Sequence, residues 1–250
     1  QGVWNVVQAV GERQAEEEKR LVRAYENDEL CGEREVPVLF EEADGLWLSM
    51  QRESRKGSSK GKSELKIGVV YEGWEQRYPC SKEYKTIEKT AFAGYMKPGD
   101  FKALRDAVVA EKYNTDEIQY RVLNGDGAPW IVNGHDTEDS LFQLDPYHLS
   151  KSVIRNVYDK NSRRHIMRWL KEGQFEKVFR KLEELKYECG GLESEVKKLT
   201  ALEVYIKSNK GSIVPYRERA GIKLPSPPEG VEYRNLGTME RNVNIFAKRM

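Results

Sequence analysis

The stretch that constrains the fold most is a short acidic turn that follows a predicted strand. Residues 117–124 carry strand-forming side chains and alternate polar with apolar residues in their second half, which predicts a β-strand. The strand leads into Gly125-Asp126-Gly127-Ala128-Pro129-Trp130. Glycines remove side-chain bulk and permit unusual backbone angles, so Asp126 can stand clear of a sheet as a metal ligand. An ordinary Asp-Gly turn explains the same residues.

A second acidic residue lies within an earlier strand region. Residues 36–50 form two alternating runs that are separated at Ala43-Asp44-Gly45. An acidic side chain at a mid-sheet position costs free energy unless it is paired or binds a metal ion. Asp44 is therefore a second candidate ligand. A bulge or a hairpin turn at the Asp-Gly dipeptide is the alternative.

The order of the predicted elements indicates the fold class. Strands are expected at residues 36–50, 65–71, 84–95, 117–124 and 141–144, with one helix that starts at Asp100 and another at residues 149–158. Three sequential strands, followed by strands that are joined through helices, favour an α/β fold. We expect a mixed sheet with flanking helices.

From residue 161 the pattern changes to helices alone. Apolar residues keep helical spacing through residues 166–206, which predicts an all-helical insertion rich in Lys and Arg. A Gly- and Pro-containing connector follows at residues 209–230. A last amphipathic helix is predicted after Thr238, its expected cap, and Glu240 lies in its first turn. A solvated glutamate at a helix start is the alternative for Glu240.

The ends of the chain point to a longer protein. Residues 3–29 predict a helix that connects from a missing N-terminal region, and the last predicted helix continues to Met250. No run of about 18 apolar residues exists, so no membrane span is expected. The three cysteines are isolated and lack CxxC spacing, which favours reduced thiols in a cytosolic protein and argues against a zinc site.

The net charge of +1 conceals an uneven distribution of charge. Residues 1–150 hold 20 Lys and Arg against 28 Asp and Glu, a net of −8, and residues 151–250 hold 22 against 13, a net of +9. An acidic half beside a basic half suits a carboxylate metal site next to a phosphate-binding surface. Charged, solvated helices explain the same numbers.

Three acids from distant parts of the chain form a candidate constellation. If the first and fourth strands are neighbours, Asp44 and Asp126 come together, and a helix across that sheet can bring Glu240. Clustered carboxylates repel one another and are tolerated when divalent cations neutralise them. Oxygen-only ligands favour Mg²⁺ or Mn²⁺ over zinc, and two such ions about 4 Å apart can promote phosphodiester chemistry.

Several separated motifs occur together in one order. They are Glu42-Ala43-Asp44-Gly45, the Gly125–Trp130 stretch, Leu144-Asp145-Pro146-Tyr147-His148, and Leu236-Gly237-Thr238-Met239-Glu240 with Ala247-Lys248-Arg249-Met250. With these motifs the chain resembles the ISLre-type bacterial insertion-sequence transposases, which are related to the Mutator-like DDE transposases. The resemblance runs from about residue 36 to the C-terminus. It implies a ribonuclease-H-like catalytic fold that is interrupted by an all-α insertion before the last catalytic helix.

The resemblance also assigns the segments and the site. It implies a helical connector at 1–35, the first part of the catalytic core at 36–160, an insertion and Pro-rich connector at 161–230, and a return to the core at 231–250. Asp44, Asp126 and Glu240 would be the catalytic, metal-binding triad.

Asp145 and His148 match the signature that such transposases carry between the second Asp and the Glu. His148 would contact DNA near the cut or support the site. Alternatively, Asp145 caps the following helix and His148 packs within it.

The resemblance suggests DNA contacts in the insertion and at the C-terminus. Trp169 would lie in the insertion, where related transposases use an aromatic side chain against DNA bases, although a core tryptophan fits as well. The basic candidates for phosphate contacts are Arg163, Arg164, Arg168, Lys248 and Arg249. A solvated basic helix is the alternative for these residues.

We therefore expect the catalytic domain of a DDE-type DNA transposase, a metal-dependent enzyme that uses two ions of Mg²⁺ or Mn²⁺. The expected partner is double-stranded DNA, both element ends and target, bound by a homo-oligomer in the bacterial cytoplasm at the nucleoid. Two alternatives stay open. One is a catalytically inactive or domesticated DNA-binding derivative, and the other is a hydrolytic nuclease without strand transfer.

Overall fold

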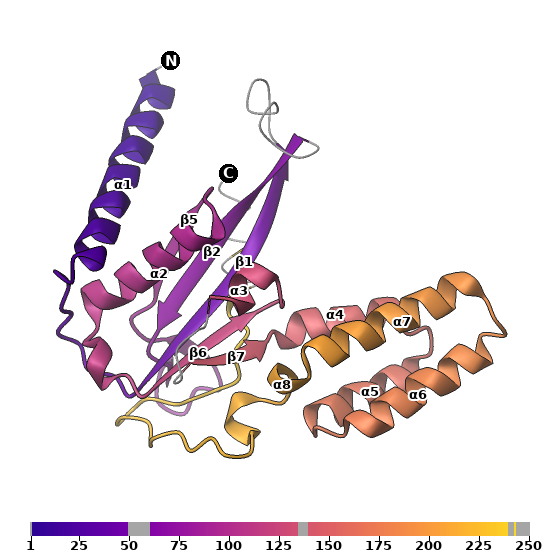
Figure 1. The fold of residues 1–250 in the computed structure, drawn as a ribbon. Coiled ribbons are helices and arrows are strands. Elements are labelled where there is room, and N and C mark those ends of the chain that lie inside the picture. Colours follow the sequence, from indigo (N-terminus) through magenta and orange to yellow (C-terminus); the bar gives the residue numbers. More distant parts are fainter. Residues whose placement is uncertain (1, 50–60, 135–139, 240–242, 244–250) are drawn as a thin grey trace.

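The computed structural model describes residues 2–49, 61–134, 140–239 and 243. Its centre is a five-stranded mixed sheet in the order β5-β2-β1-β6-β7, with helices packed around it, so the fold is mixed α/β (Figure 1). The strands of this sheet are β1 (Val38–Ser49), β2 (Lys62–Tyr71), β5 (Thr90–Gly94), β6 (Tyr120–Gly125) and β7 (Ser140–Leu144). The strands β3 (Trp74–Gln76) and β4 (Tyr84–Thr86) form a separate two-stranded sheet.

The helices pack against one face of this sheet and extend beyond one end of it. They are α1 (Gly2–Glu26), α2 (Pro98–Lys112), α3 (Pro129–Val132), α4 (Pro146–Asn156), α5 (Lys160–Lys171), α6 (Phe175–Glu188), α7 (Glu193–Ser208) and α8 (Lys210–Ile213), with short 3-10 turns η3 (Thr115–Glu117) and η4 (Tyr216–Glu218). Among the described residues, no helix combines the length and the apolar character that crossing a membrane requires.

The direction of the strands changes at β1. Strand β2 is antiparallel to both of its neighbours, β1 and β5, whereas β1, β6 and β7 run parallel to one another. The first and fourth strands of the sequence-predicted order, β1 and β6, are neighbours, which meets the condition under which Asp44 and Asp126 come together. Parallel strands end at a common edge, so residues that follow β6 and β7 lie near the same edge of the sheet.

The strand β1 is continuous through its acidic dipeptide. Asp44 pairs with Ile67 of β2, and Gly45 pairs with Lys66, in an unbroken antiparallel register. The alternative of a bulge or hairpin turn at this Asp-Gly is therefore wrong, because cross-strand pairing to β2 overrides the turn preference of the dipeptide. Beside β6, however, the pairing of β1 ends at Glu42, so Asp44 lies just beyond the parallel part of the sheet.

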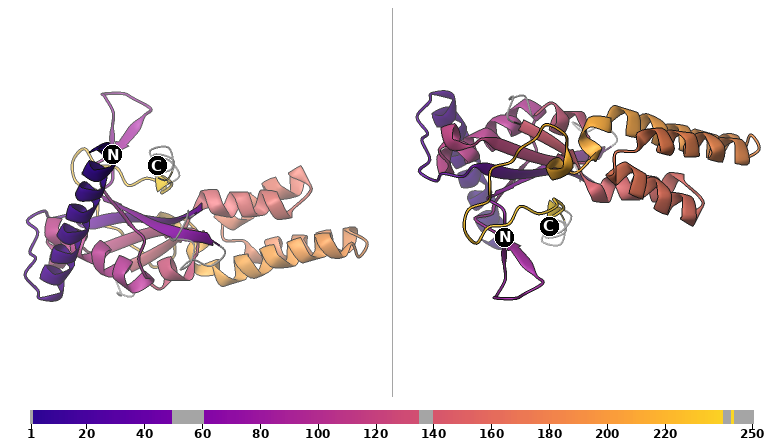
Figure 2. Two further views of the ribbon diagram at one scale, coloured as in Figure 1. Left: turned by 90° about the horizontal axis from the view of Figure 1, so that it is seen from above. Right: turned by 90° about the horizontal axis from the view of Figure 1, so that it is seen from below.

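The two faces of the sheet bury separate apolar clusters. Val38 and Phe40 of β1 belong to one cluster, whereas Leu39 and Ala43 belong to the other, as the twofold alternation of a strand requires. We call these the even face and the odd face. The helices α2 and α3 and part of the helical region cover the odd face. The even face is covered by residues 216–239 (Figure 2).

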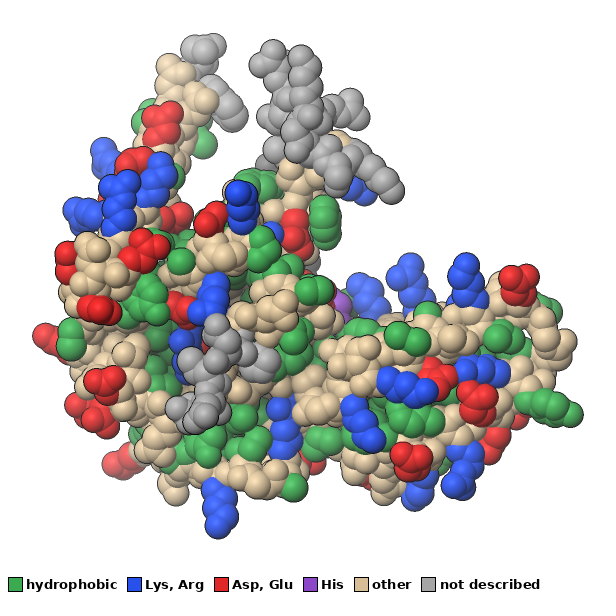
Figure 3. All heavy atoms as spheres, in the orientation of Figure 1, with side chains coloured by type: hydrophobic (Ala, Val, Ile, Leu, Met, Phe, Trp, Pro, Cys, Tyr) green, Lys and Arg blue, Asp and Glu red, His purple; other side chains and the backbone are tan. Residues whose placement is uncertain are grey.

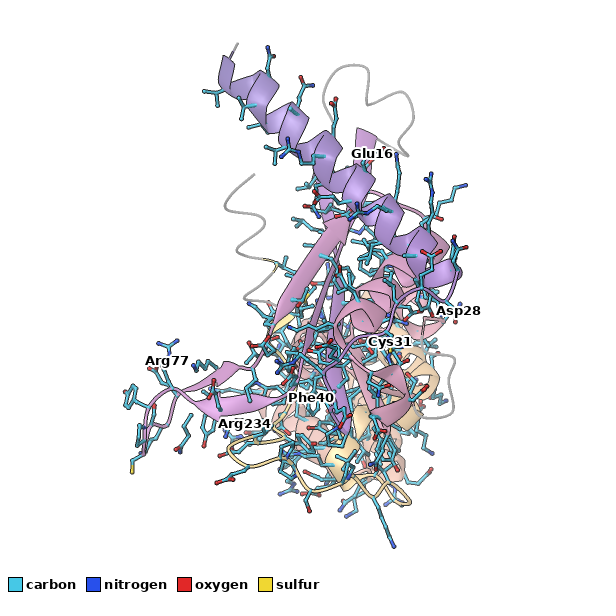
Figure 4. The ribbon with its side chains drawn as sticks, turned by 90° about the vertical axis from the view of Figure 1, so that its left-hand side faces the viewer. Glu16, Asp28, Cys31, Phe40, Arg77 and Arg234 are labelled. Carbon is cyan, nitrogen blue, oxygen red and sulfur yellow. The ribbon has the colours of Figure 1, made fainter. Side chains whose placement is uncertain are left out.

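Aromatic side chains fasten the C-terminal segment to the even face. Phe40 lies at the centre, with ring centroids 5.1 to 5.8 Å from Tyr71, Trp74, Tyr216 and Tyr233. At the rim the guanidinium of Arg234 lies 3.5 Å from the ring centroid of Tyr84 in β4, and Figure 4 shows Arg234 beside this small sheet. Burying each large aromatic side chain stabilises the fold by roughly 1.5–3 kcal/mol. The segment that leads to residue 239 is thus held firmly.

The helices α4 to α7 form an arm that extends from one end of the sheet (Figures 1 and 2). Buried residues at helical spacing, among them Ile166, Leu182 and Leu202, hold the arm together. These residues join the cluster of the odd face without interruption. The helices expected within residues 166–206 are present as α5, α6 and α7, with a left-handed glycine at Gly173 where α5 ends.

Several predicted boundaries were wrong. The helix expected from Asp100 begins at Pro98, with Lys97 as its N-cap, and the helix expected from Leu149 begins at Pro146. Proline at the first helical position explains both differences, since its missing N–H costs nothing there. The strand expected at residues 84–95 is two strands, β4 and β5, that belong to different sheets.

Candidate active site beside β1 and the ends of β6 and β7

Three aspartates follow the parallel part of the sheet. Asp126 comes after the last residue of β6, and Asp145 comes after the last residue of β7. Those two strand ends are paired, and the N–H of Asp145 donates to the carbonyl of Gly125 at 2.8 Å. Asp44 lies two residues beyond Glu42, which pairs with Asn124 of β6. The topology therefore brings the predicted Asp44 and Asp126 to one edge, together with Asp145.

The electrostatics of Asp44 show that these groups act on one another. Burial raises the pKa of Asp44 from 3.8 to about 6, and repulsion by Asp126 and Asp145 contributes. The N–H of Gly45, which donates to Asp44 Oδ1 at 2.7 Å, and the charge of His148 oppose this rise. A carboxylate in this position is electrostatically unfavourable, and a bound cation would relieve the repulsion.

Asp126 lies in a turn that fixes its carboxylate. Its Oδ1 accepts the N–H of Ala128 at 2.8 Å, and Gly127 has φ +91°, a left-handed value that favours glycine. The hydroxyl of Tyr205 in α7 donates to the carbonyl of Asp126 at 3.1 Å. The Asp-Gly turn is thus present, and it orients the carboxylate at the edge of the sheet. The turn and the ligand readings are compatible.

Asp145 and His148 form a hydrogen-bonded pair. Asp145 Oδ1 accepts the N–H of Tyr147 at 3.0 Å and so caps α4, while its Oδ2 lies 2.9 Å from Nδ1 of His148. This hydrogen bond raises the pKa of His148; burial opposes it, and attraction by Asp145, Asp44 and Asp126 adds to it. The capping role expected of Asp145 is therefore confirmed, and the same carboxylate holds the imidazole of His148.

A metal ion would need more than the described acids. Among the residues that the structure describes, no three His, Cys, Asp or Glu side chains are placed to hold one ion. Glu240, the third member of the predicted triad, lies outside the described residues, as do Lys248 and Arg249. The two aspartates could supply only part of the coordination of Mg²⁺, which is usually held by one or two carboxylates together with water and phosphate oxygens.

The sequence reasoning missed Glu42. Its carboxylate is almost completely buried on the even face and accepts hydrogen bonds from Tyr71, Asn124, Thr238 and Met239. Two consecutive acids, Glu41-Glu42, within a strand of apolar residues were a signal that could have revealed it. Burying a carboxylate costs free energy unless it is paired or hydrogen-bonded, so each of these two acids had to have specific partners in the fold.

The basic candidates of α5 differ in their surroundings. Arg163 donates from Nε to the carbonyl of Val157 at 2.5 Å, whereas Arg164 and Arg168 are exposed. Trp169 is half-buried against the core, with its ring centroid 5.6 Å from that of His165. The arm thus presents Arg164 and Arg168 to solvent but packs Trp169 inward.

The exposed face of α4 was a further omission. Tyr147, Lys151 and Arg155 of α4 are exposed and recur every four residues, and the exposed Tyr158 follows the end of the helix. Lys151 Nζ lies 5.2 Å from the ring centroid of Tyr147. Figure 3 shows Lys and Arg side chains along the edge of the arm over α4. This aromatic and basic stripe, Tyr147 to Tyr158, begins beside the site.

Comparison with known proteins places the chain in a family. The sequence pattern of the Uncharacterised protein family (UPF0236) matches residues 4–250. Two UPF0236 proteins of Caldanaerobacter subterraneus subsp. tengcongensis are each 28% identical to this chain over 221 residues. The matched residues cover 87% of this chain in both cases, 43% of the first relative and 40% of the second. A third, from the same organism, is 29% identical over 224 residues, with 87% and 43% covered. The chain therefore spans about two-fifths of the length of these relatives. Since the match extends over nearly all of its residues, the chain belongs to the UPF0236 family.

Proposed function

We propose that this chain is the catalytic core of a DDE-type DNA transposase, which cuts and joins DNA strands with Mg²⁺ or Mn²⁺. The observation that carries the proposal is the meeting of Asp44 and Asp126. These acids are far apart in the sequence, yet they lie at one edge of the sheet and act on each other electrostatically. Two carboxylates, one within β1 and one directly after the neighbouring strand β6, are suited to holding cations for phosphodiester chemistry.

The strand order supports a ribonuclease-H-like fold. Three antiparallel strands, β5, β2 and β1, lie on one side of the sheet, and the parallel strands β6 and β7 extend it on the other. Helices flank this sheet, and the helical arm leaves the core after β7 and precedes the segment that returns to the even face. This order matches the interrupted catalytic core that the transposase resemblance implies.

The third acid of the proposed triad is Glu240. Its neighbour Met239 is buried on the even face, where its N–H donates to Glu42 Oε2 at 3.0 Å. Alternation along β1 puts Glu42 and Asp44 on the same face. The described segment that ends at Met239 therefore lies on the face of the sheet that carries Asp44.

Four described residues have roles in the proposed chemistry. Asp44 and Asp126 would hold Mg²⁺ or Mn²⁺, and with Glu240 they would hold two ions in all. The bound metal would supply activation of water or of a 3′-hydroxyl and stabilisation of the leaving oxygen. His148, charged more readily because of Asp145, would contact a phosphate oxygen next to the cut. Asp145 holds the imidazole in place.

The basic and aromatic stripe on α4 suits double-stranded DNA. Lys151 and Arg155 can contact phosphates, and Tyr147 lies beside the site residue His148. Arg164 and Arg168 on α5 are further candidates on the arm. Phosphate contacts of this kind hold the DNA in register without reading its sequence.

The relatives add independent support. The name of one UPF0236 relative joins eleven designations within one organism. A protein sequence that recurs at many places in one genome is typical of a mobile element. We extend the proposal to a homo-oligomer that binds element ends and target DNA at the bacterial nucleoid.

The proposal is tested by Asp126→Asn in the full-length protein that carries this chain. Asparagine keeps the turn but loses the charge, so strand cleavage of DNA bearing the element ends should be abolished while DNA binding is largely retained. Cleavage by the variant at the wild-type rate would refute the site. Product analysis separates the alternatives: joined strands indicate a transposase, cut ends alone a hydrolytic nuclease, and no products from the wild type a binding derivative.

A further inference from the structure

A cavity lies where the helical arm meets the even face of the sheet. Its volume is about 470 Å³, within the range of roughly 300–1,000 Å³ that is usual for small-molecule sites. Segments that are far apart in the sequence form its walls: the end of β7 with the first turn of α4, the C-terminal half of α5, the stretch from Ile213 to Tyr216, and residues 235–236. The cavity therefore exists only in the folded protein.

The cavity shares one wall with the candidate site. Pro146 lines the cavity, and it directly follows Asp145. Leu149 lines it as well, and it directly follows His148 in the first turn of α4. A ligand in the cavity therefore lies within about one helical turn of the candidate site.

The interior of the cavity is apolar. Its one buried polar side chain, Gln143, is already hydrogen-bonded: Nε2 donates to the carbonyl of Ser212 at 2.9 Å, and Oε1 accepts the N–H of Tyr216 at 2.8 Å. The interior thus suits a flat, apolar group. The buried or half-buried apolar side chains that line it include Leu149, Met167, Ile213, Tyr216 and Leu236.

The charged side chains at the cavity are positive. Arg168 and Lys171 line it and are exposed, and neither side chain forms a salt bridge or hydrogen bond with another described residue. Arg219, which does not line the cavity, donates to Oε1 of Gln143 at 3.1 Å. Burial lowers the pKa of Arg219 to about 10, and no salt bridge within the described residues offsets this burial. No Asp or Glu is among the described residues that line the cavity, so its charge favours an anionic ligand.

We propose that this cavity binds a nucleotide that has left the base stack of the DNA strand, with its base among the apolar side chains and its phosphate at Arg168 and Lys171. This inference rests on the proposed function and adds a subsite to it. Exposed cations beside an apolar interior match the charged backbone and the apolar base faces of an unstacked strand.

Asn235 can contribute a polar contact to the base. It is exposed and lines the cavity, and its Oδ1 accepts a hydrogen bond from Arg217 at 2.9 Å. Its amide N–H₂ makes no hydrogen bond within the described part of the chain, so it can donate to an acceptor on the edge of a base.

The test measures the affinity of the full-length protein for three DNA duplexes of one sequence. The first duplex is fully paired, the second carries one additional unpaired nucleotide, and the third carries an unpaired abasic residue at the same place. Fluorescence anisotropy is measured in EDTA, which prevents metal-dependent cleavage. We expect the duplex with the unpaired nucleotide to bind roughly tenfold more tightly than the other two, because only its base can enter the cavity.

Two variants place this preference at the cavity. Met167→Trp should abolish it, because the larger side chain fills the space for the base. Arg168→Gln/Lys171→Gln should reduce it, because the phosphate loses both cations. The matched control, Lys177→Gln/Arg180→Gln, removes the same charge from exposed positions of α6 outside the cavity and should keep the preference.

The outcomes separate this inference from the proposed function. Equal affinity of the wild type for the three duplexes would overturn the cavity subsite and leave DNA binding intact. A preference that survives Met167→Trp would also overturn it, because the base would then bind elsewhere. If the wild type binds none of the duplexes at low salt, the proposed function itself is wrong.

A free mononucleotide is the other source of the same chemistry. Calorimetry with dAMP distinguishes it from a nucleotide of the strand. Binding of dAMP that Met167→Trp abolishes, together with equal affinity for the three duplexes, would assign the cavity to a free nucleotide and refute the proposed subsite for DNA.

Discussion

The two faces of β1 handle buried acids in opposite ways. On the odd face Glu41 is bound by two arginines, with Arg121 Nε 2.6 Å from Oε1 and Arg105 Nε 3.2 Å from Oε2. Burial alone would raise the pKa of Glu41, but this attraction lowers it below its ordinary value. On the even face Glu42 and Asp44 receive hydrogen bonds from N–H and O–H groups.

The difference distinguishes a carboxylate that stabilises the fold from one that can bind a cation. A guanidinium in a salt bridge with a carboxylate neutralises its charge and leaves no room for a metal ion. Hydrogen-bond donors orient a carboxylate without cancelling its charge, so Asp44 keeps an electrostatic demand that a cation can meet. Strand β1 thus contains Glu41, whose charge is neutralised by arginines of the protein, and, three residues later, Asp44, whose charge is suited to a bound cation.

The largest expected effect comes from breaking the compensated face. Arg121→Met should destabilise the protein by about 3–5 kcal/mol, because it leaves Glu41 buried with less counter-charge. Urea unfolding measures the change in the free energy of unfolding. The double variant Glu41→Gln/Arg121→Met should lose less than the sum of the single variants. Additive losses would show that the pair is not coupled and would weaken the comparison.

A smaller effect concerns the pH dependence that Asp44 imposes. Its pKa is raised to about 6 in the folded state, so folding takes up a proton, and stability should fall as pH rises from about 4 through 6. The contribution is about 2 kcal/mol after allowance for solvent screening. Asp44→Asn should remove this slope, and Mg²⁺ should flatten it in the wild type. Measurement of the free energy of unfolding between pH 4 and about pH 7 tests both expectations. A slope that persists in Asp44→Asn would mean that another group titrates.

The smallest effect tests whether the arm shares in the function of the even face. Lys151→Gln/Arg155→Gln should weaken binding of double-stranded DNA and reduce the salt dependence of the affinity by about one unit of slope for each residue. The matched control is Lys177→Gln/Arg180→Gln on α6, which removes the same exposed charge. Fluorescence anisotropy at several salt concentrations measures both. Equal losses in the two double variants would mean that α4 has no special role.

The sequence pattern was sufficient to predict the main strands and a mixed sheet. Alternating and apolar runs located β1, β2, β6 and β7, whereas the pairing of the first and fourth strands was only a condition under which Asp44 and Asp126 would meet. These features depend on local periodicity and on the glycines around Asp126, both of which can be read from a few residues. Helix boundaries were less accurate, because Pro98 and Pro146 began helices earlier than the apolar pattern indicated.

The parts that could not be predicted depend on distant partners. Nothing near Glu41 in the sequence identifies Arg121 as its counter-charge, and nothing near Glu42 identifies the N–H groups of Thr238 and Met239. Local patterns showed that buried acids existed, but not which atoms would satisfy them. The continuity of β1 through Asp44 also depends on a distant segment, because pairing with β2 overcomes the turn preference of Asp-Gly.

The shared role of Asp145 has a consequence for any substitution at this position. Its carboxylate both caps α4, through the N–H of Tyr147, and holds the imidazole of His148, while its own N–H donates to the carbonyl of Gly125 at the end of β6. Replacement of this one side chain would therefore release the imidazole and remove the helix cap together, so the two contributions cannot be separated by a change at residue 145 alone.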